Sequence, residues 1–168
     1  MKHALISSLS VLLLSARLAA AGTQPVWSEI GKDGLQVGIA VTNTAVKALG
    51  DIKADITFRN AGKQPLAINT WDLAAGYFGL SVLDAAGKPV PKLPPPMPAP
   101  PPGTEAGKKW QANRAKGNVE IAPGNQVSYA FSAPISLSQP SGKYFVVFTH
   151  AGLTTPRVAV TLTAPAGE

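Results

Sequence analysis

The chain has 168 residues, 16 prolines, 16 glycines, no cysteine and a formal net charge of +6. The lack of cysteine excludes disulfides and thiol chemistry, so stability must come from packing. Residues 89–116 carry five basic residues against one acidic residue, whereas the rest of residues 22–168 is neutral. A neutral body with one basic segment indicates a local contact, rather than general binding to nucleic acid or a membrane.

The N-terminus has the pattern of a secretory signal peptide. Lys2 precedes an apolar run over residues 4–14, and Ala19, Ala20 and Ala21 supply small residues for cleavage. The pattern predicts a signal peptide at residues 1–21 and a secreted or periplasmic location. Since no cysteine follows the run and no second apolar segment is long enough to span a bilayer, we expect neither a lipid anchor nor membrane insertion after cleavage.

Residues 22–168 are expected to form one domain, large enough to bury a core without covalent links. Apolar and polar residues alternate with a period of two, which is typical of strands with one buried face. Turn residues separate these segments every 8–12 residues. The pattern predicts an all-β fold, an antiparallel immunoglobulin-like β-sandwich of seven or eight strands. The predicted strands are residues 35–41, 52–58, 66–69, 77–83, 119–121, 127–131, 144–149 and 158–162.

Three aromatic residues of the most apolar predicted strand allow finer predictions. Tyr144 follows a glycine at the start of a late strand, where a tyrosine corner is expected; a plain core aromatic is the alternative. Phe145 and Phe148 are three positions apart, so alternation places them on opposite faces of the sheet. We therefore expect one of them to be buried and the other to be partly exposed.

Residues 89–116 separate the two halves of this pattern. The segment contains nine prolines, and proline cannot join a sheet ladder because it lacks the N–H donor. The composition predicts one long basic Pro-rich loop within the domain, and loops of this length are functional or disordered. A short helix over residues 106–116 is the alternative for its second half.

The long segment also holds the candidate partner-binding residues, because it carries the net charge and a lone tryptophan. Trp and Arg are enriched in binding hot spots. Trp27 and Trp71 are expected to pack at the ends of the sandwich, where the indole N–H can find a partner. Trp110 either anchors the segment on the sandwich or is an exposed anchor for a partner. The candidate set is Lys92, Met97, Lys108, Lys109, Trp110 and Arg114.

Catalytic chemistry is not expected. His150 is the only histidine outside the predicted signal peptide, and neither a Ser-His-Asp triad nor a zinc-binding helix can be assembled. His150 is interpreted as a surface residue at the end of a strand. Asp51 and Asp55 are predicted on the outward face of one strand, and Asp33, Asp72 and Asp84 in turns. The sequence therefore predicts no enzyme, no metal and no cofactor, with calcium binding by turn carboxylates as a lesser alternative.

Four phrases of the sequence resemble the N-terminal immunoglobulin-like pro-domain of deuterolysin-type metalloendopeptidases, and more weakly β-sandwich domains of proteinase-inhibitor type. They lie between residues 35 and 150, and the chain contains no peptidase zinc motif. The resemblance implies a non-catalytic module of the kind that masks or chaperones a protease. The phrases are residues 56–66, 78–90, 115–127 and 140–144.

Together these observations predict an exported, non-catalytic β-sandwich that binds another protein, with a secreted protease as the candidate partner. An extended, proline-stiffened segment loses less entropy on docking than a flexible one. The alternative is a structural or accessory envelope protein in which the Pro-rich segment is a spacer.

Overall fold

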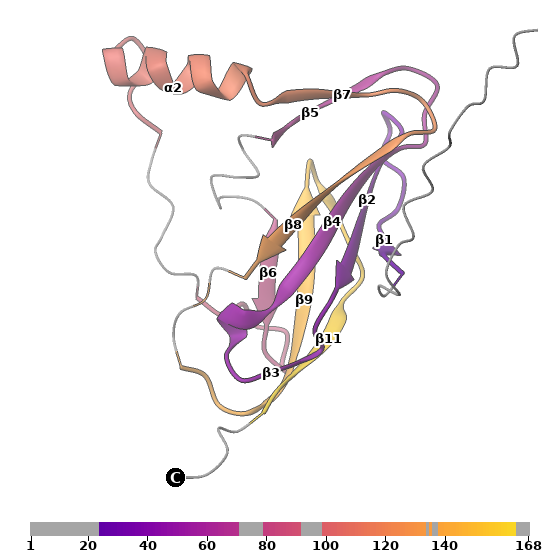
Figure 1. Ribbon diagram of the computed structural model, residues 1–168, viewed down its shortest axis with the longest axis vertical. Coiled ribbons are helices and arrows are strands. Elements are labelled where there is room, and N and C mark those ends of the chain that lie inside the picture. The colour runs from indigo at the N-terminus through magenta and orange to yellow at the C-terminus, as the bar shows by residue number, and fades with distance from the viewer. Residues whose placement is uncertain (1–23, 71–78, 92–98, 134, 136–137, 164–168) are drawn as a thin grey trace, which may run out of the picture.

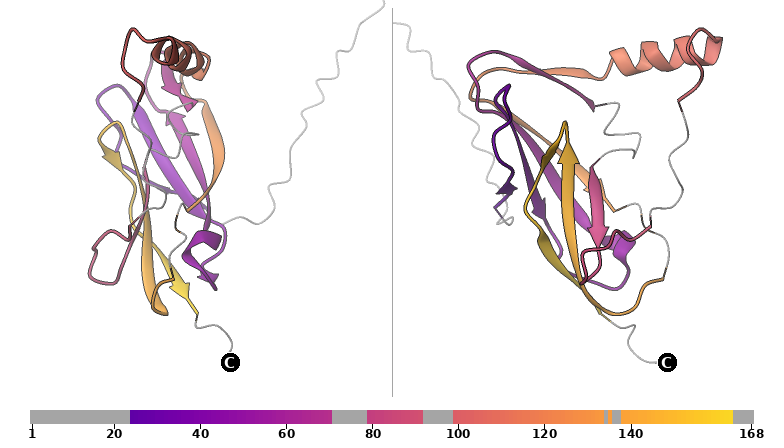
Figure 2. Two further views of the ribbon diagram at one scale, coloured as in Figure 1. Left: turned by 90° about the vertical axis from the view of Figure 1, so that its left-hand side faces the viewer. Right: turned by 180° about the vertical axis from the view of Figure 1, so that it is seen from behind.

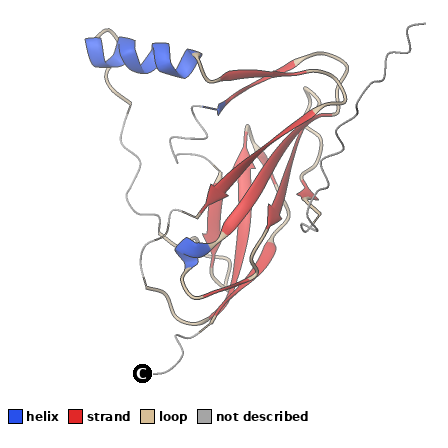
Figure 3. Ribbon diagram, in the orientation of Figure 1, coloured by secondary structure: helices blue, strands red, loops and turns tan. Residues whose placement is uncertain are grey.

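The computed structural model describes residues 24–70, 79–91, 99–133, 135 and 138–163. These residues form two facing sheets and a narrow two-stranded extension that ends in a helix (Figures 1 and 3). The all-β prediction and the sandwich are confirmed. The predicted signal peptide, Trp71, Asp72 and the first residues of the strand predicted at 77–83 lie outside the described residues.

The first sheet has the order β1 (Val26–Trp27), β2 (Leu35–Val41), β4 (Lys53–Asn60) and β8 (Gln126–Ser132), and all its pairs are antiparallel. Alternation works as predicted, because every second side chain of β4 enters the core. Ala54, Ile56 and Phe58 are fully buried, while Lys53, Asp55 and Arg59 are exposed. The central strands β2 and β4 therefore form one wall of the core.

The second sheet is built around β9 (Gly142–His150), which pairs with β6 (Leu80–Leu83), β10 (Leu153–Thr154) and β11 (Val158–Leu162). The short strand β3 (Ala45–Val46) adds to β11 in parallel. Phe148 is fully buried and its ring meets Phe58 of the first sheet edge to face, with centroids 5.9 Å apart. This aromatic contact joins the two layers at the centre of the core.

Two of the aromatic predictions for β9 are confirmed. The Tyr144 hydroxyl donates a hydrogen bond to the Pro140 carbonyl at 2.7 Å, which is the bond expected of a tyrosine corner. Phe148 lies inside the core, whereas Phe145 is half-buried on the opposite face, between Lys143 and Arg157. The period of two thus placed both phenylalanines correctly.

Two side chains lie elsewhere than expected. Asp51 is not on the strand with Asp55: it ends the 3₁₀ helix η1 (Leu49–Asp51), where its carboxylate accepts the Ala48 N–H. Trp27 does not close an end of the sandwich but covers the outer face of the first sheet. Its ring lies against Gly38, where a Cβ atom would come within 2.8 Å, and the Arg59 guanidinium lies 5.9 Å from its centre.

The extension, called the arm below, consists of β5 (Leu66–Asn69), β7 (Asn118–Ile121) and the helix α2 (Glu105–Ala115). Figure 2 shows from two further sides that α2 lies at the far end of the β5–β7 ladder, beyond the sandwich. The prediction of one long loop over residues 89–116 is wrong for its second half, and the alternative of a short helix is confirmed. The start of the segment is also ordered, because the Val90 N–H bonds the Val82 carbonyl of β6.

Candidate functional site

The arm leaves the sandwich at a corner fixed by Asn60. This side chain is fully buried and donates hydrogen bonds of 2.8 Å to the carbonyls of Gln64 and Ile121. Its oxygen accepts the Gly62 N–H at 2.9 Å. The Asn60 amide therefore closes the turn after β4 and joins this turn to the end of β7. One side chain thus fixes both chain segments that connect the sandwich to the arm.

The helix α2 starts at a capped and covered turn. The Thr104 hydroxyl accepts the Gly107 N–H at 3.0 Å, as an N-cap residue does. Gly107 is buried although the surrounding helix is exposed. The reason is a close approach of the preceding segment, since a Cβ atom at Gly107 would collide with the Pro101 carbonyl. The last prolines before α2 thus lie against its first turn.

The other end of α2 is held by β5. The Asn69 amide donates to the Arg114 carbonyl at 2.9 Å, and the Thr70 hydroxyl donates to the Gly117 carbonyl at 2.9 Å. Carbonyls at a helix end have no partner within the helix. These two residues lie more than 40 positions earlier in the chain, so the helix end is fixed by a tertiary contact and the helix is tied to the ladder.

The candidate cations fall on different sides of α2. Lys108 forms an exposed ion pair with Glu105 at 2.7 Å, whereas Lys109 and Lys116 are seven positions apart and share another face. Arg114 lies about 140° around the helix from Lys109, because each residue turns the helix by about 100°. The helix and Lys116 carry four basic residues against Glu105, a net charge of +3. Of the remaining candidates, Lys92 and Met97 lie outside the described residues.

Trp110 is half-buried. The Arg114 guanidinium lies over its ring at 5.6 Å, in the i, i+4 arrangement that brings helical side chains together. Trp110 is absent from the buried cluster of the described residues and from the side chains packed against it. The structure therefore does not show Trp110 anchoring this segment on the sandwich core.

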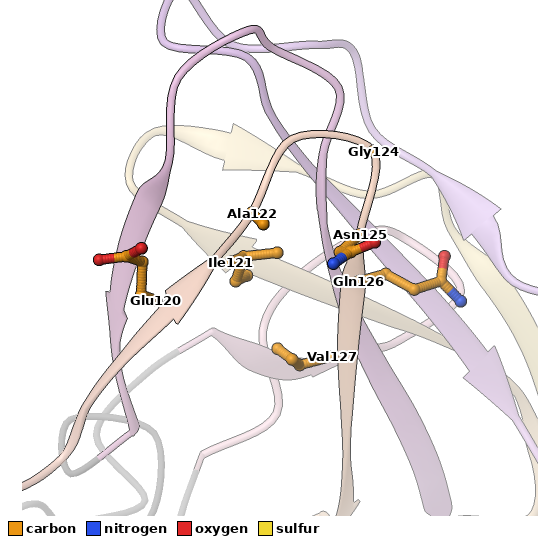
Figure 4. Close-up of a pocket in the computed structure, with 7 residues that line it drawn as sticks. All are labelled: Glu120, Ile121, Ala122, Gly124, Asn125, Gln126 and Val127. Carbon is orange, nitrogen blue, oxygen red and sulfur yellow. The ribbon is translucent and has the colours of Figure 1, made fainter.

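A pocket of about 500 Å³ lies at the foot of the arm, where the chain turns from β7 into β8 (Figure 4). Among the described residues that line it, Glu120 is the only charged one, and Ile121 and Val127 supply apolar walls. A second pocket of about 510 Å³ is lined by Ile30, Lys32, Asp33 and Leu153 among others. Sequence patterns predicted neither pocket. The first is lined by a single segment, residues 120–127, whereas the second is formed by residues 30–35 and 151–153, which meet only in the folded chain.

The polar residues Asp33, Asp84 and His150, considered in the sequence analysis, have contacts of a structural kind. Asp33 accepts the Leu35 N–H, and Asp84 accepts the N–H groups of Ala86 and Lys88, so both cap turns as predicted. His150 is at the end of β9 as expected, but it is half-buried and its ring lies 5.1 Å from that of Phe58. Within the described residues, no three His, Cys, Asp or Glu side chains gather in a way that could hold a metal ion.

Comparison with known proteins gives no family: no family model matches the chain, and no curated protein matches it. No helix in the described part of the chain is long and apolar enough to cross a membrane.

Proposed function

We propose that this chain is an exported, non-catalytic protein-binding module whose arm contacts an acidic surface of a partner protein. The observation that carries the proposal is the net charge of +3 on α2 and Lys116, on a helix held beyond the sandwich by its own ladder (Figure 1). A concentrated positive charge speeds encounter with an acidic partner and fixes the orientation of docking.

The construction of α2 supports a role in binding. Its side chains are polar around almost the whole circumference, and Gly107 is its only buried residue. A helix of this kind gains little from packing, so its stability depends on its caps and on local pairs. The chain nevertheless fixes both ends of α2, through Thr104 at the start and Asn69 and Thr70 at the end.

The arm offers two kinds of contact to a partner. Lys109 and Lys116 form a cationic face, whereas Trp110 and Arg114 form a stacked pair in which the flat ring is braced by a guanidinium. Arg and Trp are the residue types found most often at binding hot spots. The resemblance to pro-domains of deuterolysin-type peptidases makes a secreted protease the first partner to test.

The test compares two variants with equal loss of charge. The arm variant is Lys109→Gln, Arg114→Gln and Lys116→Gln, and the control is Lys32→Gln, Lys47→Gln and Lys63→Gln, three exposed lysines outside the arm. Each immobilised variant is exposed to proteins secreted by the exporting cell. We expect a partner that the wild-type chain and the control retain, that the arm variant loses, and that salt releases.

Equal retention by the arm variant and the control would show that the arm is not the contact. In that case the structural or accessory role, in which residues 89–116 act as a spacer, becomes the better account.

A further inference from the structure

The free edge of β8 is the longest strand edge that the described residues leave unpaired. At the opposite end of the same sheet, β1 has only two residues. The second sheet is closed by the two-residue strand β3 and, beside β6, by residues 89–90, which bond back to β6. The arm strands β5 and β7 each have four residues. In contrast, β8 has seven and pairs only with β4 in the described part of the chain.

The register shows which backbone groups face this edge. The Ala133 N–H bonds the Ile52 carbonyl, and the Asn60 N–H bonds the Asn125 carbonyl. In an antiparallel ladder, bonded and non-bonded pairs alternate, so odd-numbered residues from 125 to 133 direct their N–H and C=O groups to β4. The even-numbered residues of β8 direct theirs outward. These are Gln126, Ser128, Ala130 and Ser132.

Within its own seven residues, the strand has none of the sequence features that usually keep an edge from pairing. Natural edges are protected by charged side chains, prolines, bulges or short length. The sequence of β8, Gln-Val-Ser-Tyr-Ala-Phe-Ser, contains no charge and no proline, and its pairing with β4 is continuous over all seven residues. Its exposed side chains, those of the even-numbered residues, are small or uncharged, so another strand can approach the edge closely.

We propose that β8 pairs with β8 of a second copy of this chain, antiparallel and centred on Tyr129. This register places Gln126 opposite Ser132 and Ser128 opposite Ala130, so that every outward N–H and C=O group of both strands has a partner. A shift in either direction leaves some of these groups unpaired. The two-fold axis brings no like charges together, because the strand has none.

Pairing about Tyr129 is self-complementary, which fits a second copy of the same strand: small or uncharged residues lie opposite one another, and apolar residues lie opposite apolar residues. Val127, Tyr129 and Phe131 face the core but are only half-buried, since β8 is the last strand of its sheet. Pairing places Val127 of one copy beside Phe131 of the other and covers these apolar side chains. The arms then leave from opposite ends of the strand pair, because β7 leads into the start of β8.

The first test measures molecular mass in solution by sedimentation equilibrium, using the wild-type chain and two lysine variants. Ala130→Lys places a charge at the proposed interface, next to Asp55 of β4 within the same copy. The control Ala67→Lys is also an exposed alanine opposite an acid, Glu120, but it lies in the arm. We expect the wild type and the control to form dimers, and Ala130→Lys to weaken dimerisation at least about tenfold.

A wild-type chain with the mass of one copy at all concentrations, or dimers of Ala130→Lys as stable as those of the wild type, would overturn the proposal. Binding of β8 to a strand of another protein would appear as the first of these outcomes. The proposal is independent of the proposed function, because the β8 edge contains none of the cations of the arm.

The second test checks the register by disulfide formation. The chain has no native cysteine, so introduced cysteines are the only thiols that can react. Bonded residues of antiparallel strands have Cα atoms about 5.5 Å apart, within the range that a disulfide can join. We expect an equimolar mixture of Ser128→Cys and Ala130→Cys to form covalent dimers faster than either variant alone. Equal rates for the mixture and the single variants would contradict a register centred on Tyr129.

Discussion

Asn60 shows how much of this architecture depends on one side chain. It is fully buried and makes three hydrogen bonds, to the carbonyls of Gln64 and Ile121 and from the Gly62 N–H. Asn60→Ala leaves these groups without a partner at the corner of the arm. Since each unsatisfied buried group costs about 1–3 kcal/mol, we expect a loss of about 3 kcal/mol in the free energy of unfolding, measured in urea.

Asn43→Ala is the matched control for this prediction. The Asn43 side chain also bonds backbone groups, the Asp51 carbonyl and the Lys53 N–H, but at an exposed site where water can replace it. We expect a loss of about 1 kcal/mol or less from this variant. Equal losses from the two variants would show that burial of Asn60 is not what makes it important.

Tyr129 makes stability depend on pH at the alkaline end. Desolvation by burial raises the pKa of its hydroxyl above the ordinary value. The folded chain therefore holds this proton more tightly than the unfolded chain, and stability falls as the pH rises from about 10 through the folded pKa. We expect Tyr129→Phe to reduce the alkaline loss of stability relative to the wild type. Parallel stability curves for the two chains would contradict this.

At the scale of an element, α2 reverses a usual rule about glycine. Replacing glycine by alanine within an exposed helix normally stabilises the helix by about 1 kcal/mol. A Cβ atom at Gly107 would instead collide with the Pro101 carbonyl. We expect Gly107→Ala to destabilise the start of α2 and to separate it from the preceding prolines. The measurement is faster exchange of the amides of residues 107 and 108, which bond to Thr104 in the wild type.

The control for Gly107→Ala is Gln111→Ala, at an exposed position in the middle of the same helix. Alanine has the higher helix propensity, so this variant is expected to slow amide exchange in α2 slightly. Slower exchange in both variants would mean that the proline segment does not restrict Gly107.

At the scale of the whole molecule, the sandwich and the helix α2 differ in what holds them together. The buried cluster of the described residues contains side chains from both sheets, and it includes Phe148 but no residue of α2. We expect Phe148→Ala to lower the free energy of unfolding by about 3–5 kcal/mol. Lys109→Pro, which breaks α2, is expected to change the unfolding of the sandwich by less than about 0.5 kcal/mol while helical circular dichroism is lost.

Phe145→Ala separates burial from the simple loss of an aromatic ring. Phe145 is in the same strand as Phe148 but lies half-buried on the outer face, between Lys143 and Arg157. Its removal should cost clearly less than that of Phe148, because it leaves no cavity in the core. Equal losses from the two variants would contradict the assignment of their faces.

Much of the sandwich was predictable from the sequence, because a strand with one buried face repeats every two residues whatever its neighbours are. The alternation in residues 35–41 and 52–58 located β2 and β4, and the glycine before Tyr144 indicated its corner. The position of Asp51 was not predictable in this way. Alternation alone placed Asp51 on the strand, although β4 begins only at Lys53. Asp51 instead belongs to η1, where its carboxylate accepts the Ala48 N–H.

The candidate site was predictable only in part. Composition located the charge and Trp110 in residues 89–116, but proline content favoured a loop throughout. The helix forms because Thr104 caps its start and because Asn69 and Thr70, from a distant strand, bond its end. Composition also treated the cations as one set, whereas helical geometry separates Lys109 from Arg114 and pairs Lys108 with Glu105.

The sequence by itself thus determined which residues face the core and where the net charge lies, because both follow from local order along the chain. Only the tertiary structure decided that the basic segment ends in a helix on an arm and that β8 is an edge strand. Strand order depends on which segments meet across long loops, and hydrophobic alternation is the same for a strand at the centre of a sheet and one at its edge.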